Sequence, residues 1–152
     1  MYRPVKASAI SIKPKKWDKA YNADKAEAFF RKAADESPEL ILTTEGVLEG
    51  YTVMDVLEGR MPPEAMLEIA EPIDGDYMVR FRRLARTLKT CISFGFAERV
   101  KRDVYNTAVF IDAEGEICGK QHKVQLAEGT HKSWYFNRVG RTLRAFEASL
   151  TG

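Results

Sequence analysis

Residues 39–46, with the sequence Glu-Leu-Ile-Leu-Thr-Thr-Glu-Gly, are the stretch that decides the fold, because a short apolar run before a loop is typical of a buried strand. Upstream, residues 5–12 alternate with period two, apart from small residues, and predict another strand. Between them, apolar residues at helical spacing predict a helix that Asn22 caps and that runs to about Asp35. A strand, a helix and a second strand predict a β-α-β unit with parallel strands.

The rest of the chain predicts one more main helix and several strands. Residues 76–89 carry an apolar stripe and predict a helix, after an irregular connection rich in Gly and Pro. Further strands are predicted over residues 91–97, 104–112, 116–123 and 143–150, with a turn at 112–115 and a polar loop at 127–132. About six strands and two main helices indicate an α/β protein with a mixed sheet, forming a single domain over residues 1–152.

Composition and charge argue against several classes of protein. The chain has 24 Lys and Arg against 22 Asp and Glu, a formal net charge of +2, which is not the charge of a nucleic-acid-binding domain. The basic residues of 76–89 stand opposite an apolar stripe and are explained by a solvated helix face. The sequence shows no signal-peptide pattern and no apolar run that could span a membrane. We therefore expect a cytoplasmic protein that binds neither nucleic acid nor membrane.

Cysteine and histidine are both scarce, with two of each. Cys91 and Cys118 are too few to cross-link a small secreted fold, and both are interpreted as buried structural thiols. His122 and His131 have no third or fourth ligand at metal-binding spacing, and no Gly-x-Gly-x-x-Gly follows a strand. We expect no metal and no other cofactor.

Two residues are candidates for chemistry. Glu45 stands where the strand of residues 39–44 ends, at the edge of the sheet where α/β proteins place their sites. The apolar residues 40–42 before it would partly desolvate its carboxylate and raise its pKa, as a general base requires. Lys123 ends a predicted strand, where its ammonium could stabilise an oxyanion. Taken alone, each position is better explained as ordinary solvated surface charge.

Four sequence blocks surround these two residues. Residues 39–51 carry Glu45 and end in Gly-Tyr, residues 105–108 read Tyr-Asn-Thr-Ala, residues 112–126 lead through a turn to Lys123, and residues 135–140 contain Tyr-Phe-Asn and a glycine. In order and spacing the four blocks resemble the nitrilase superfamily of carbon–nitrogen hydrolases. The resemblance covers essentially the whole chain, from Val5 to Gly152.

That resemblance implies a four-layer α-β-β-α sandwich, of which this chain would form part, and hydrolysis of a non-peptide carbon–nitrogen bond. Glu45 would be the general base and Lys123 would stabilise the oxyanion of the tetrahedral intermediate. A cysteine would attack the amide or nitrile carbon and form a thioester-linked acyl-enzyme. Residues 134–137 are more similar to the N-carbamoyl amidohydrolase branches than to true nitrilases, which implies a small linear amide or N-carbamoyl compound as substrate.

The sequence departs from the family pattern at three points. The nucleophilic cysteine of the family follows the next strand, beyond Gly152, and neither cysteine of this chain fits its motif. Lys132 stands where many members have a glutamate that orients the catalytic lysine, which leaves Glu128 as a nearby substitute. Gln125 occupies a position where the family often has histidine.

The missing cysteine leaves two hypotheses open. The chain is either part of an amidase whose cysteine lies beyond residue 152, or a non-catalytic truncated homologue that acts in binding or assembly or is an inactive fragment. Without the second half of a sandwich, apolar sheet faces and strand edges would be exposed. We therefore expect a homo-oligomer or pairing with a complementary chain.

Overall fold

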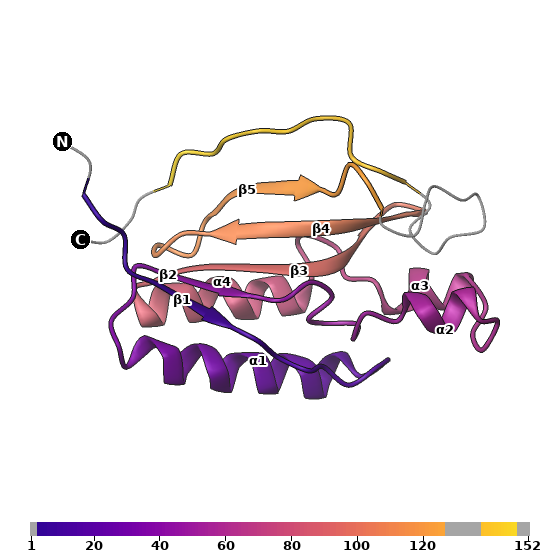
Figure 1. The fold of residues 1–152 in the computed structure, drawn as a ribbon, viewed down its shortest axis with the longest axis horizontal. Coiled ribbons are helices and arrows are strands. Elements are labelled where there is room, and N and C mark those ends of the chain that lie inside the picture. Colours follow the sequence, from indigo (N-terminus) through magenta and orange to yellow (C-terminus); the bar gives the residue numbers. More distant parts are fainter. Residues whose placement is uncertain (1–2, 127–137, 149–152) are drawn as a thin grey trace.

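The computed structural model describes residues 3–126 and 138–148 and contains a five-stranded mixed sheet with strand order β1-β2-β3-β4-β5 (Figure 1). The strands are β1 (Ala7–Ile10), β2 (Leu40–Thr43), β3 (Cys91–Val100), β4 (Asp103–Ile111) and β5 (Ile117–His122). The pairs β1–β2 and β2–β3 are parallel, whereas β3–β4 and β4–β5 are antiparallel. The expected α/β class, the mixed sheet and the parallel β-α-β unit are confirmed.

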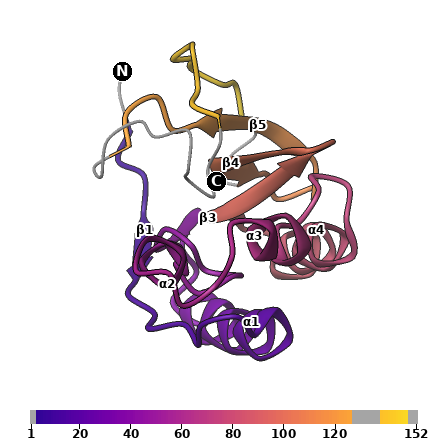
Figure 2. The same ribbon diagram turned by 90° about the vertical axis from the view of Figure 1, so that its right-hand side faces the viewer.

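Two long helices cover one face of the sheet. Helix α1 (Lys19–Ala34) connects β1 to β2, and α4 (Asp76–Leu88) precedes β3. Both lie on the same side of the sheet (Figures 1 and 2). The ring of Phe30 in α1 meets Phe81 in α4 edge to face at 5.8 Å, and Phe81 packs on Phe94 of β3 at 4.8 Å. All three aromatic side chains are buried, so this face of the sheet is closed to solvent.

The first helix begins earlier than the sequence suggested. The N-cap is Asp18, whose carboxylate accepts the N–H of Tyr21 at 3.1 Å, so the cap predicted at Asn22 is wrong. Asn22 lies inside α1 and is buried, and its amide donates to the carbonyl oxygens of Lys15 and Leu48 at 2.6 and 2.8 Å. Because buried carbonyl groups require donors, the side chain that could cap the helix instead joins two loops.

Two short helices occupy the connection that the sequence predicted to be irregular. They are α2 (Val53–Leu57) and α3 (Glu64–Ile69), and they lie at one end of the sheet (Figure 1). Asp55 of α2 accepts hydrogen bonds from Lys16, Trp17 and Arg60, and these donors hold the pKa of its carboxyl group well below its usual range. Helices of five and six residues are too short to show a helical repeat in sequence.

The strand predicted over residues 143–150 is wrong for residues 143–148, which have no regular secondary structure. Residues 138–148 run beside β5 as an irregular segment (Figure 1). Gly140 donates its N–H to the carbonyl of Lys123 at 2.8 Å, and the amide of Gln121 donates to the carbonyl of Thr142 at 2.6 Å. Isolated bonds of this kind do not form a ladder, so an alternating pattern was insufficient to predict a strand. The loop predicted at 127–132 lies outside the described residues.

No helix in the described part of the chain is both long enough and apolar enough to cross a membrane.

Candidate active site

Glu45 lies just beyond the end of β2, on a loop that contacts the backbone of β3. Gly95 of β3 donates its N–H to the carbonyl of Thr44 at 3.2 Å, and its own carbonyl accepts the N–H of Val47 at 2.8 Å. A Cβ atom at position 95 would lie only 2.8 Å from the Cα of Glu45. Glycine therefore lets the loop cross β3 in direct backbone contact, and this contact sets the height of Glu45 above the sheet.

Lys123 follows β5 directly, and the β4–β5 register determines where its side chain lies. Thr107 of β4 pairs with His122, so the next residue lies beside Asn106, and the N–H of Lys123 donates to the Asn106 carbonyl at 2.8 Å. Successive side chains of a strand point to opposite faces. Asn106 and Lys123 therefore share the face of the sheet opposite to that of Thr107 and His122.

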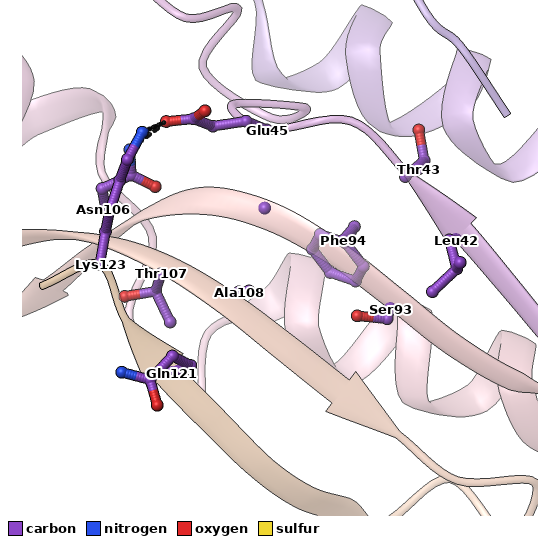
Figure 3. A pocket seen from close by; sticks show the side chains of 11 residues that line it. Leu42, Thr43, Glu45, Ser93, Phe94, Asn106, Thr107, Ala108, Gln121 and Lys123 are labelled. Carbon is purple, nitrogen blue, oxygen red and sulfur yellow. Dashed lines mark hydrogen bonds and ion pairs between the residues drawn. The ribbon is translucent and has the colours of Figure 1, made fainter. Parts of the chain in front are cut away.

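The two predicted residues form an ion pair. The Lys123 ammonium lies 2.9 Å from Oε1 of Glu45, although 78 positions separate the two residues in sequence. The side-chain amide of Asn106 donates to the same oxygen (Figure 3). Two donors, one of them charged, orient the carboxylate, and because both reach Oε1 the second oxygen accepts from neither.

A cavity of about 320 Å³ opens beside this ion pair. It is lined by residues of β2, β3, β4 and β5 and the segments that follow: Leu42, Thr43, Glu45, Ser93, Phe94, Gly95, Asn106, Thr107, Ala108, Gln121 and Lys123. Glu45, Asn106 and Lys123 gather at one end, while Leu42, Ser93 and Ala108 lie further along (Figure 3). A small cavity with its charged groups at one end suits a small molecule with one polar reacting group.

The ion pair is accessible to solvent. The side chains of Glu45 and Lys123 are 40% and 32% exposed. The expectation that apolar residues 40–42 would desolvate Glu45 is wrong for the described chain, since Leu42 at the cavity is itself 36% exposed. An exposed pair is held weakly, so its members can exchange their mutual contact for contacts to a substrate.

Neither cysteine lies at the cavity. Cys118 is in β5, five residues before Lys123, which is about 17 Å along a strand. Its thiol is within 3.4 Å of the Asp112 carboxylate, and burial together with that carboxylate raises the pKa of Cys118 to about 11. Cys91 is buried at the start of β3, and burial raises the pKa of its thiol. Both thiols are protonated at neutral pH, the opposite of an activated nucleophile.

Several other residues considered from the sequence do not join the site. Glu128, His131, Lys132 and residues 134–137 lie outside the described residues. His122 points to the other face, where its Nε2 is 2.8 Å from the Glu98 carboxylate and its ring stacks on Tyr105 at 4.0 Å. Gln125 does not line the cavity. Within residues 3–126 and 138–148, no three His, Cys, Asp or Glu side chains are arranged to hold a metal ion.

Three residues at or next to the site had no predicted role. Asn106 carried a signal, because a polar side chain interrupts an apolar strand, and it is 8% exposed in the structure. Gly95 carried another, since a glycine within a strand often marks a close backbone approach. Glu49, four residues after Glu45, is buried, and nothing in the local pattern distinguishes it from a solvated loop glutamate.

Comparison with known proteins points to one family. The profile of the carbon–nitrogen hydrolases matches residues 6–149. The chain is 27% identical over 133 residues to an N-carbamoylputrescine amidase of Oryza sativa subsp. japonica, and 27% identical over 154 residues to a nitrilase of Bradyrhizobium diazoefficiens. These matches cover 83% and 95% of this chain but 41% and 48% of the two relatives. The chain therefore spans less than half the length of either relative.

Solved structures show the same fold. An amidase from Nesterenkonia sp. aligns with a TM-score of 0.69 and 19% identity, covering 91% of this chain and 49% of the amidase. The C. elegans NitFhit protein aligns with a TM-score of 0.72 and 18% identity, covering 90% of this chain and 33% of that protein. The fold that the sequence blocks implied is confirmed by these likenesses.

Proposed function

Because the chain belongs to the carbon–nitrogen hydrolase family, we propose that it supplies the general base and the oxyanion-stabilising cation for hydrolysis of a non-peptide carbon–nitrogen bond. The observation that carries the proposal is the 2.9 Å contact between Lys123 and Glu45 at one end of a cavity. A base and a cation that share one small cavity are the two groups needed to move a proton and to stabilise developing negative charge.

In the proposed reaction, Glu45 takes the proton of a cysteine thiol, and the thiolate attacks the carbonyl carbon of an amide. The carbonyl electron pair moves to oxygen, where the Lys123 ammonium stabilises the oxyanion. Glu45 returns its proton to the nitrogen as the carbon–nitrogen bond breaks, so that ammonia or an amine leaves and a thioester remains. Glu45 then deprotonates a water that attacks the thioester, and collapse of this second intermediate releases the acid and regenerates the thiol.

The thiol must come from elsewhere in the protein or from a partner chain. Neither Cys91 nor Cys118 lines the cavity, and the thiols of both have raised pKa values. Asn106 and Lys123 lie on the face of the sheet opposite to the one that α1 and α4 cover, and a further segment that brings the nucleophile would approach the cavity from that face. Homo-oligomerisation or a complementary chain is the corresponding proposal for assembly.

The proposed substrate is a small linear amide or N-carbamoyl compound. A cavity of about 320 Å³ accommodates a compound of that size. Its two charged groups lie at one end and uncharged side chains, both polar and apolar, line the rest, so one polar reacting group and a short uncharged chain are the features it would select. Similarity to a relative named N-carbamoylputrescine amidase supports the same class.

The test is ammonia release from linear amides and N-carbamoyl compounds by the full protein that the gene encodes, with its native partners. Glu45→Gln preserves the size of the side chain but removes the base, and should lower kcat/KM about 10³-fold. The matched control is Glu68→Gln, at an exposed position of α3, which should leave kcat/KM unchanged. Equal activity of wild type and Glu45→Gln would contradict the proposal.

A non-catalytic role is the second candidate, favoured by the observation that neither Cys91 nor Cys118 lines the cavity. It predicts that the complete protein releases no ammonia from any amide and that Glu45→Gln has no effect beyond ligand binding. Mass spectrometry decides between the two, because trapping of a covalent thioester adduct on a cysteine would exclude the non-catalytic role.

A further inference from the structure

A second glutamate lies beneath the loop that carries Glu45. The side chain of Glu49 is 1% exposed, and its Oε2 accepts the backbone N–H of Ala97 in β3 at 3.0 Å. Its other oxygen, Oε1, is buried, and no donor from the described residues reaches it. A charged oxygen in such a position would lack both water and a hydrogen-bond donor, whereas a neutral carboxyl group tolerates it at far lower cost.

The Glu49 side chain packs under the turn that carries Glu45. A Cβ atom at Gly46, which has φ +66°, would lie 2.9 Å from Oε1 of Glu49, so this oxygen lies directly under the residue that follows Glu45. The carbonyl of Gly46 accepts the N–H of Gly50 at 2.9 Å and closes the turn over the Glu49 side chain. Gly95 and Ala97 of β3 therefore hold the loop at two points, one beside Glu45 and one through Glu49.

Two charged side chains act on the Glu49 carboxyl group. Burial raises the pKa of Glu49 to about 7, and the neighbouring Glu45 carboxylate raises it as well, while the N–H groups of Ala97 and of Glu49 itself and the Lys19 ammonium lower it. Lys19, in the first turn of α1, is already bound to Glu71 at 2.7 Å, which limits its effect. Glu49 therefore changes charge close to neutral pH, next to the proposed base.

We propose that Glu49 is a positioning residue for Glu45, whose buried carboxyl group holds the turn of residues 45–51 against β3 and places an ionisable group beside the proposed base. This inference rests on the proposed function of Glu45. Below neutral pH, Glu49 is uncharged and adds no negative charge beside Glu45. Once Glu49 ionises, a buried negative charge lies beside the Glu45 carboxylate, and like charges repel each other at short range. Glu49 does not line the cavity and touches no substrate.

The experiment follows the side-chain carboxyl signals of Glu45 and Glu49 by NMR in the full protein, from about pH 4 to about pH 9. In wild type, Glu49 should titrate near neutral pH and the Glu45 signal should show an inflection at the same pH. Glu49→Gln can still accept the Ala97 N–H but cannot ionise, so this inflection should vanish. The control Glu68→Gln should behave as wild type. In parallel, the pH profile of kcat/KM should lose a step of about two- to fivefold near neutral pH only in Glu49→Gln.

An unchanged Glu45 curve in a folded Glu49→Gln variant would overturn the proposal. If that variant does not fold, the wild-type protein decides, because titration of Glu49 at its ordinary value would also overturn it. The NMR measurement needs no turnover. Coupling of the two signals without any hydrolysis would therefore refute the proposed function and leave the electrostatic link intact, whereas hydrolysis without coupling would refute only the role of Glu49.

Discussion

Two glutamate–lysine pairs stand on opposite faces of the same sheet. Glu98 pairs with Lys120 on the face that continues the helix-covered core and is 0% exposed, whereas Glu45 pairs with Lys123 on the open face and is 40% exposed. The two lysines are three positions apart along β5 and the residue that follows it, and an odd separation puts them on opposite faces.

The two carboxylates also differ in how fully they are hydrogen-bonded. Oε1 of Glu98 binds Lys120, and its Oε2 binds the Thr107 hydroxyl at 2.9 Å and His122 at 2.8 Å. The two donors that the described residues supply to Glu45 share a single oxygen. A buried carboxylate with both oxygens occupied cannot take a proton without losing bonds, and an open one can. Spare acceptor capacity and solvent access, rather than residue type, thus separate a reactive pair from a structural one.

The largest expected effect is a loss of activity on breaking the exposed Glu45–Lys123 pair. Lys123→Met should lower kcat/KM about 10³-fold, because the oxyanion loses its cation, while the free energy of unfolding changes by less than about 1 kcal/mol. Its matched control, Lys120→Met, should keep kcat/KM near the wild-type value. It should lower the free energy of unfolding by about 2 kcal/mol, because the buried Glu98 carboxylate loses its lysine partner. Ammonia-release kinetics and urea unfolding measure both quantities. Similar losses of kcat/KM in the two variants would contradict the assignment of Lys123 to a reactive pair and Lys120 to a structural one.

The next largest effect is expected on stability, from breaking the pair of the buried Glu98 with Lys120. Glu98→Ala should lower the free energy of unfolding by about 3 kcal/mol, because it removes a fully buried side chain and takes the acceptor from the Thr107 hydroxyl, Lys120 and His122. Glu45→Ala should lower it by less than about 1 kcal/mol, since that pair is exposed. Urea denaturation of both variants provides the comparison, and a larger loss in Glu45→Ala would contradict it.

Glu49 is an intermediate case, buried like Glu98 but incompletely hydrogen-bonded. Because its pKa rises from the usual 4.5 to about 7 on folding, the folded state binds more protons than the unfolded state between these values. The contribution of Glu49 to stability is therefore full below about pH 4.5 and is lost as pH rises through about 7, a decline of about 2 kcal/mol between pH 5 and pH 7.5. The measurement is the difference in unfolding free energy between wild type and Glu49→Gln across this range. A flat difference would contradict the raised pKa.

The smallest expected effect on kcat/KM comes from the backbone contact between β3 and the loop that carries Glu45. Gly95→Ala places a Cβ atom 2.8 Å from the Cα of Glu45, so the loop must move away from β3 and kcat/KM should fall about tenfold. Gly59→Ala is the control: it has open space around it and φ +72°, so it should cost about 1 kcal/mol of stability without changing kcat/KM. Equal kcat/KM in Gly95→Ala and wild type would show that the loop tolerates the shift.

Elements with a long repeating pattern were predicted well, and short or irregular ones were not. The apolar stripe of α4 and the β-branched run of β4 identify both elements, because burial of one face imposes the period on the sequence. The short helices α2 and α3 lack a repeat, and residues 143–148 alternate without pairing as a strand. Asn22 has capping chemistry but is used inside α1, since buried carbonyl groups outside the helix required its amide.

The candidate site divides in the same way. Glu45 and Lys123 could be named from the sequence, because each closes a predicted strand inside a block that resembles one family. Their contact and the part played by Asn106 could not, since 78 positions separate the pair and the strand order alone brings them together. The expected desolvation of Glu45 was wrong, because local hydrophobicity does not report the exposure of a loop above a sheet.

By itself, the sequence determined the α/β class, the parallel β1–β2 unit and the residue types that the proposed chemistry requires, because these follow from local periodicity and from motifs in order along the chain. Only the tertiary structure decided that Lys123 contacts Glu45 beside a cavity, that Glu45 is exposed while Glu98 is buried, and that Glu49 is buried beneath the proposed base. The physical reason is that burial and hydrogen-bond saturation depend on contacts between segments far apart in sequence, and a strand register assigns neighbouring side chains to opposite environments.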